Sequence, residues 1–217
     1  MKVVVVGGGS WGTAFAALLR DRGHEVTLAC RDPKQVRAIE ETGHNPRYLT
    51  ATDLRRVKAA TVEDAPVAEA DLVVLAVPSR AFAEVAEALP GNAPVLILTK
   101  GLDPATGNRL STRVQGRPVA VLSGPNMAEE IAQGLPSATV IASEDRELAE
   151  RLQEAINSMV FRVYVNDDLA DLRCGLVCAR TLGDQLACTA VAPVPRVTGD
   201  VQVAHAGEPG KGLRLSP

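Results

Sequence analysis

The residues with the clearest chemical potential stand near the amino terminus, where three glycines follow a run of valines. Gly7, Gly9 and Gly12 have the G-x-G-x-x-G spacing, and they lie between the apolar segment 3–6 and a helix-forming stretch. In that context the first glycine allows a tight turn, the second lets a pyrophosphate approach the backbone, and the third lets the helix pack closely on the strand. Unpaired N–H groups at the helix N-terminus favour an anion. The pattern predicts a dinucleotide-binding site; the alternative is a plain turn between strand and helix.

A second group of polar residues follows later apolar runs. Lys100 comes directly after the apolar segment 94–99, and the segment 123–126 (Ser-Gly-Pro-Asn) ends another such run. An ammonium group offers a point charge and three donors to a phosphate or a carbonyl oxygen. Polarising a carbonyl helps a hydride to reach its carbon, because negative charge grows on the oxygen. Lys100 could also simply close a strand, and 123–126 could be only a turn.

The elements that must position these residues alternate along the chain. We predict strands at 2–6, 25–30, 57–60, 71–77, 94–99, 119–123, 138–143 and 161–166, and helices at 10–22, 34–42, 81–88, 127–133 and 146–158, with a brief helical link at 62–69. This order predicts an α/β fold, a doubly wound Rossmann-type sheet with helices on both faces. Ligands bind such sheets beyond the carboxyl ends of the strands, where the glycine turn, Lys100 and 123–126 all fall. We therefore expect one shared cleft.

The choice of coenzyme depends on the end of the second predicted strand. NAD-selective folds place a carboxylate there, about 20 residues after the glycine turn, to hold the ribose 2′-hydroxyl. Here Arg31 occupies that position and Asp32 follows it. A guanidinium can bind a 2′-phosphate through two donors and stack on the adenine. We therefore predict NADP as the favoured coenzyme and NAD as a tolerated one. For Asp32, capping of the next helix is the more ordinary role.

Composition limits the classes of partner and compartment. The 217 residues are 46% hydrophobic and 23% charged, with a formal net charge of −3. This balance gives no reason to expect a nucleic acid or an anionic membrane as a partner. The apolar start is too short to span a bilayer and lacks the features of a signal peptide, so we expect a cytoplasmic protein. Cys174, Cys178 and Cys188 match no common zinc spacing, and we expect no metal.

Several segments together carry a family resemblance. In order and spacing, the sequence resembles the amino-terminal half of bacterial NAD(P)-dependent glycerol-3-phosphate dehydrogenase over residues 1 to about 170. The resemblance implies interconversion of glycerol 3-phosphate and dihydroxyacetone phosphate, feeding phospholipid synthesis. The segments that carry it are 7–14 (Gly-Gly-Gly-Ser-Trp-Gly-Thr-Ala), 31–33, 45–49 (Asn-Pro-Arg-Tyr-Leu), 76–79, 99–102, 123–132, 134–138 and 161–164.

The resemblance also implies roles for individual residues. Coenzyme contacts fall on the three glycines and on Ser10, Trp11, Arg31, Tyr48, Lys100 and Ala128. Substrate contacts fall on Lys100, Gly124 and Asn126, and Lys100 is the catalytic candidate because it touches both ligands. Asn126 departs from the serine or threonine that is usual in the family; its amide can still form hydrogen bonds, but it is larger.

The resemblance ends where the family completes its chemistry. The family's proton-transferring lysine aligns by spacing with Ala179, and the family's second helical domain is largely missing from the sequence. We therefore predict a dinucleotide-binding domain at 1–168 and a divergent, partly disordered remnant at 169–217. The abrupt change is consistent with a shifted reading frame. An alanine transfers no proton, so we expect weak or no turnover. We also expect self-association, because the face toward the missing domain would stay apolar.

Two other functions compete with an active dehydrogenase. One is a non-catalytic NADPH-binding module, or an inert fragment, that keeps residues 1–168 without the chemistry. The other is a different reductase with the same coenzyme fold that acts on a hydroxy acid. Trp11, Tyr48 and the segment 123–126 argue against that reductase.

Overall fold

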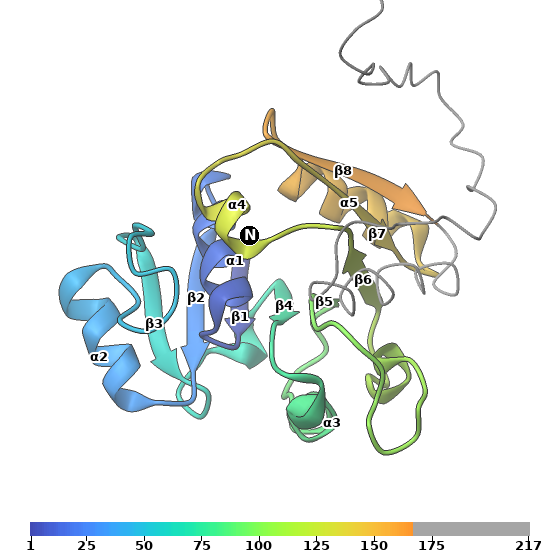
Figure 1. Cartoon of the computed structure of the whole chain (residues 1–217). Helices are drawn as coiled ribbons and strands as arrows, with labels where there is room; N and C mark the ends of the chain where they lie inside the picture. Colours follow the sequence, from blue (N-terminus) through green and yellow to red (C-terminus); the bar gives the residue numbers. More distant parts are fainter. Residues whose placement is uncertain (167–217) are drawn as a thin grey trace, which may run out of the picture. The chain divides into compact units, whose positions relative to one another are not determined.

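The structure, a computed structural model, describes residues 1–166. It forms one sheet with helices on both sides (Figure 1). The strands are β1 (Lys2–Val6), β2 (Glu25–Cys30), β3 (Val57–Thr61), β4 (Leu72–Leu75), β5 (Val95–Ile97), β6 (Val119–Ser123), β7 (Ser137–Ala142) and β8 (Phe161–Asn166). The α-helices are α1 (Ser10–Asp21), α2 (Pro33–Thr42), α3 (Ser79–Glu87), α4 (Ala128–Ala132) and α5 (Arg146–Ile156), and the 3₁₀ turns are η1 (Val67–Glu69) and η2 (Leu110–Arg113). The predictions for 169–217, including Ala179 and the three later cysteines, lie outside these residues.

The order of the strands confirms the predicted Rossmann-type sheet. The eight strands run β3-β2-β1-β4-β5-β6-β7-β8, and β1 pairs in parallel with both β2 and β4. After β1 the chain adds β2 and β3 on one side, and it then adds β4 on the other side of β1. Folds of this type bind ligands at the point where the strand order changes in this way. One pairing departs from the parallel pattern, because β7 is antiparallel to β6. The short α4 packs beside α1 without crossing back over the sheet, so the next strand starts from the same edge and runs in the opposite direction.

The core divides between the two faces of the sheet because alternate strand residues point to opposite sides. Val3 and Val5 face a cluster that includes the buried residues of α1, α4 and α5, whereas Val4 and Val6 face a cluster that includes those of α3. Phe15 is fully buried on the first face and Phe82 on the second. Strand β1 is therefore covered on both faces, which explains its continuous run of valines.

One local prediction is confirmed, and another holds only in part. Gly23 has φ +83°, as expected of a glycine that follows a helix end. The predicted helical link at 62–69 is helical only at η1, because Pro66 disfavours a helical backbone at the residue before it. None of the helices within residues 1–166 has the length and apolarity that a membrane crossing requires.

Candidate coenzyme and substrate site

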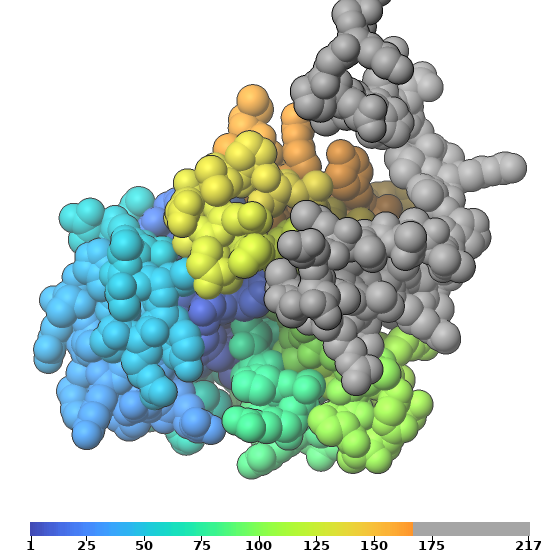
Figure 2. Space-filling model, viewed as in Figure 1, coloured from blue at the N-terminus to red at the C-terminus, as the bar shows by residue number. Residues whose placement is uncertain are grey.

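The carboxyl ends of five strands meet at one edge of the sheet. Strands β2, β1, β4, β5 and β6 are neighbours and all run in parallel. Four of them are followed at this edge by a segment that the sequence predicts to be functional, namely the glycine turn after β1, Arg31 after β2, Lys100 after β5 and 124–126 after β6. In Figure 2 dark blue atoms of the amino-terminal segment are recessed between the yellow segment around α4 and the cyan and green segments.

The three glycines of the turn differ in the space around them. Gly7 has φ +119°, and a Cβ there would lie 2.5 Å from the Ala76 carbonyl oxygen. A Cβ on Gly12 would lie 1.8 Å from the Gly7 carbonyl oxygen, so only glycine lets α1 approach the turn this closely. A Cβ on Gly9 would meet nothing within 4 Å. Gly7 and Gly12 therefore serve packing, whereas Gly9 presents open backbone to a ligand.

The N-terminus of α1 supplies donors without helical partners. Gly9 precedes the helix and offers no side chain to cap it. The first helical hydrogen bond runs from the Thr13 N–H to the Gly9 carbonyl oxygen at 2.9 Å, so the N–H groups of Ser10, Trp11 and Gly12 have no acceptor in the helix. These donors lie beside the open space at Gly9 and fit the pyrophosphate of a dinucleotide.

The Gly8 backbone is held by buried side chains for which the sequence predicted no individual role. Its carbonyl oxygen accepts hydrogen bonds from Gln35 Nε2 at 2.6 Å and from Asn45 Nδ2 at 3.1 Å. A Cβ on Gly8 would lie 2.4 Å from Cys30 Sγ. Burial raises the pKa of the Cys30 thiol to about 11, so this support under the turn is a neutral thiol. The only sequence signal was Asn45 standing before a proline, which indicates a turn but not a buried amide.

Arg31, Asp32, Arg47 and Tyr48 gather near the end of β2. Asp32 Oδ1 accepts a hydrogen bond from the Lys34 N–H at 2.9 Å, which confirms its predicted role as the cap of α2. The exposed Arg31 side chain forms no hydrogen bond or ion pair with any described residue. The Arg47 guanidinium lies 4.0 Å from Asp32 Oδ2 and 5.7 Å from the centre of the half-exposed Tyr48 ring. Arg31 is thus available to an anion.

Lys100 projects into the protein beside the glycine turn. Its Nζ lies 5.3 Å from the centre of the Trp11 ring, within the range of a cation–π interaction. The Nζ atom is buried and has no hydrogen-bond partner among the described residues. Burial lowers the pKa of the Lys100 ammonium, because an apolar environment disfavours the charged form. The preceding Thr99 donates to the Val77 carbonyl oxygen at 2.8 Å, which ties the end of β5 to the segment after β4.

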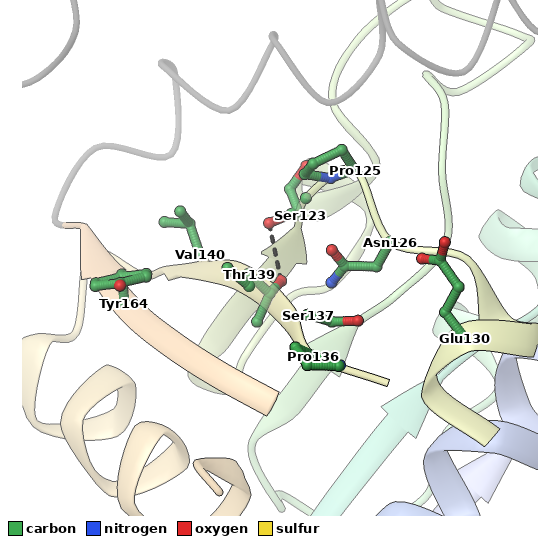
Figure 3. A pocket seen from close by; sticks show the side chains of 11 residues that line it. Ser123, Pro125, Asn126, Glu130, Pro136, Ser137, Thr139, Val140 and Tyr164 are labelled. Atoms are coloured by element: carbon green, nitrogen blue, oxygen red, sulfur yellow. Dashed lines mark hydrogen bonds between the residues drawn. The ribbon is translucent and has the colours of Figure 1, made fainter. Parts of the chain in front are cut away.

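The segment after β6 lines a cavity of about 330 Å³ that extends to Tyr164 on β8 (Figure 3). The Asn126 side chain points into this pocket, and its Nδ2 atom is buried without a partner in the described part of the chain. A Cβ on Gly124 would lie 3.0 Å from the Ala138 carbonyl oxygen, so the turn packs closely on β7. Ala128 is buried at the start of α4, where α4 packs on α1. The pocket therefore offers the Asn126 amide donor, which has no partner among residues 1–166, and its lining also includes the carboxylate of Glu130.

Sequence comparisons agree with the architecture. A family model described as "NAD-dependent glycerol-3-phosphate dehydrogenase N-terminus" matches residues 2–149. The chain is 40% identical over 202 residues to a glycerol-3-phosphate dehydrogenase [NAD(P)+] of Nocardia farcinica, covering 86% of this chain and 60% of the relative. It is 42% identical over 182 residues to the Moorella thermoacetica enzyme of that name, covering 80% and 54%. The chain thus spans little more than half the length of these relatives.

Solved structures give the same result. A Coxiella burnetii glycerol-3-phosphate dehydrogenase superposes with a TM-score of 0.74 at 33% identity, covering 80% of this chain and 56% of that one. A ketopantoate reductase from Ralstonia eutropha, at 24% identity and a TM-score of 0.58, shares only the fold, so the hydroxy-acid reductase alternative gains no support. The match over residues 2–149 shows that the chain belongs to the family of NAD-dependent glycerol-3-phosphate dehydrogenase N-terminal domains.

Proposed function

We propose that this protein binds NADP or NAD at the glycine turn and acts on the glycerol 3-phosphate and dihydroxyacetone phosphate couple. The observation that carries the proposal is the buried Lys100 ammonium, which lies over Trp11 and has no acceptor among residues 1–166. A buried cation without a partner is costly, and an anionic or carbonyl-bearing ligand would supply the missing acceptor. When bound, the nicotinamide supplies or accepts the hydride.

At the coenzyme end, the first N–H groups of α1 would hold the pyrophosphate. Ser10 and Trp11 contribute two of these donors, and the open side of Gly9 lets the phosphates approach. Arg31 would bind the 2′-phosphate, which favours NADP while NAD remains tolerated. Tyr48 and Ala128 would complete the contacts, Tyr48 near the adenosine and Ala128 through α4 next to α1.

At the substrate end, Lys100 would orient the substrate and polarise its carbonyl. Its ammonium can donate to the carbonyl or phosphate oxygen of dihydroxyacetone phosphate. Because the group is buried, its field on a developing oxyanion is stronger than it would be in water. Gly124 and Asn126 would add contacts from the segment after β6, with the free Asn126 Nδ2 as a second donor.

The extent of turnover depends on a position outside the described residues. Ala179 aligns with the family's proton-transferring lysine, and we propose that turnover by this chain is weak or absent. Calorimetry with NADPH tests coenzyme binding, and NADPH oxidation with dihydroxyacetone phosphate tests turnover. Binding without turnover agrees with this proposal and with a non-catalytic module, whereas turnover at the rate of a full-length relative contradicts the predicted inactivity. Absence of NADPH binding overturns the proposed function.

We also propose cytoplasmic location and self-association, with no nucleic acid or membrane as partner. Strand β8 ends the sheet, and apolar side chains are exposed on it and just before it: Tyr164 on the strand is 44% accessible, and Met159 and Val160, which precede the strand, are 87% and 41% accessible. An apolar edge of this kind favours contact with a second copy. Light scattering should therefore detect dimers or larger species, and a monomer at every concentration tested would contradict self-association.

A further inference from the structure

The most extensive buried polar network in the coenzyme region centres on Asn45. This side chain has no solvent exposure. Its Nδ2 donates to the Gly8 carbonyl oxygen at 3.1 Å and to Thr13 Oγ1 at 2.7 Å. Its Oδ1 accepts from Gln35 Nε2 at 3.1 Å, and the same Gln35 nitrogen also donates to Gly8. One amide thus joins the glycine turn, α1 and α2.

The same amide also holds the loop of Tyr48. Asn45 Oδ1 accepts the Arg47 N–H at 3.0 Å and the Tyr48 N–H at 3.2 Å. These bonds fix the backbone that carries two side chains near the end of β2. Both ends of the predicted coenzyme site, the phosphate turn and the adenosine loop, therefore depend on one buried side chain.

We infer that Asn45 is a positioning residue for the dinucleotide, acting through Gly8 and through the backbone of Arg47 and Tyr48. Its donor groups turn the Gly8 carbonyl inward, which leaves the following N–H groups directed at the phosphates. Its acceptor oxygen sets the loop at the adenosine end. The inference rests on the proposed coenzyme binding at this same site.

The two halves of the amide can be separated by substitution. Asn45→Ala removes both the donor and the acceptor. Asn45→Asp has the same size and keeps the acceptor for the loop, but its carboxylate no longer donates to Gly8. Ser143→Ala is a matched control, because Ser143 is also buried and donates to a backbone carbonyl, that of Val119, at 2.6 Å. It follows β7, which runs away from the site edge.

The experiment compares the full chain and these variants by calorimetry, with NADPH and with 2′-AMP, which lacks the 5′-phosphate and therefore probes the adenosine end alone. We expect Asn45→Ala to weaken both ligands about tenfold or more, the equivalent of one or two lost hydrogen bonds. Asn45→Asp should bind 2′-AMP within about threefold of the parent and NADPH about tenfold more weakly. Ser143→Ala should lower the Tm while leaving both affinities unchanged.

A purely structural role predicts a different pattern. In that case the Asn45 variants, studied well below their Tm, bind both ligands as the parent does, and this result overturns the inference. Should Asn45→Ala not fold, the contrast between the two ligands in Asn45→Asp carries the test, and equal affinities for parent and variant overturn it. If the parent itself binds no NADPH, the proposed function fails rather than the contrast among variants.

Discussion

The sheet edge that carries the candidate site has two ends, and they differ in whether their buried polar groups have hydrogen-bond partners. At the coenzyme end, every hydrogen-bonding group of the Asn45 amide has a protein partner, and the Gly8 carbonyl oxygen accepts two hydrogen bonds. At the proposed substrate end, Lys100 Nζ and Asn126 Nδ2 are the buried side-chain donors for which residues 1–166 provide no partner. The proposed coenzyme end is thus satisfied as a scaffold, whereas the proposed substrate end leaves two buried donors without acceptors among residues 1–166.

This difference indicates where the protein accepts a cost in stability. A buried donor without a partner costs about 1–3 kcal/mol, and more when it is charged. Native proteins keep such groups where a ligand supplies the partner. The proposed coenzyme end instead relies on backbone N–H groups at the start of α1, which have no acceptor in the helix and adjoin the buried network. Breaking each end should therefore have different consequences for stability and for binding.

The largest effect should follow Gly12→Ala at the coenzyme end. The added Cβ meets the Gly7 carbonyl oxygen at 1.8 Å, a backbone atom that moves only with the turn. Overpacking of this kind costs about 3 kcal/mol or more, against the gain of at most about 1 kcal/mol that alanine normally brings to a helix. We expect a loss of stability of this size in urea unfolding, together with loss of NADPH binding.

Gly9→Ala provides the matched control for this prediction. Its Cβ meets nothing within 4 Å, so unfolding should change by no more than about 0.5 kcal/mol. NADPH binding should still weaken, because the methyl group occupies the approach to the backbone. Equal stability for Gly12→Ala and Gly9→Ala would show that the turn yields, and that its tight packing is not required.

Lys100→Met tests the substrate end and should separate binding from stability. Removal of the ammonium takes away the predicted contact with the substrate, and we expect affinity for dihydroxyacetone phosphate in the presence of NADPH to fall about 100-fold. Stability should stay level or rise by about 0.5–1 kcal/mol, because the buried charge without a partner is gone. Calorimetry and urea unfolding measure the two quantities. A destabilised variant with unchanged affinity would assign Lys100 to structure.

Raising the pH into the alkaline range should change the free energy of unfolding in opposite directions through Cys30 and through Lys100. Burial raises the pKa of Cys30 from 9.0 to about 11, so its contribution to stability is complete below pH 9 and is lost as the pH rises toward 11. Burial lowers the pKa of Lys100 below 10.5, so its cost is present at neutral pH and disappears as the pH rises from the lowered pKa to 10.5. By pH 10.5, linkage makes the loss of stability due to Cys30 about 1–2 kcal/mol.

Unfolding in urea at pH 8 and pH 10.5 measures both contributions. Cys30→Ala should remove the alkaline loss of stability, and Lys100→Met should remove the alkaline gain. Variants whose pH dependence equals that of the parent would show that neither group titrates differently in the folded state.

The sheet edge that carries the candidate site could be predicted from the sequence, but the difference in polar pairing between its two ends could not. The sequence predicted β1, β2, β6 and β8 with their observed bounds, because short segments rich in apolar and β-branched residues between turn residues are a local signal. It also placed Lys100 at the same edge as the glycine turn. The antiparallel β7 depends on where the five-residue α4 packs, which is a tertiary property. Asn45 was missed because a polar residue in a loop is normally exposed, and only the fold shows it buried.

Arg31→Ala should have the smallest effect, and it tests the outer limit of the coenzyme end. The side chain is exposed and has no ion-pair partner among the described residues, so its removal leaves stability unchanged. A contact between an exposed guanidinium and a phosphate is screened by solvent, and we expect NADPH binding to weaken only about fivefold at moderate salt. NADH lacks the 2′-phosphate and should bind the variant as it binds the parent. Equal losses for NADPH and NADH would mean that Arg31 contacts the adenine or ribose instead, and that the predicted coenzyme preference has another source.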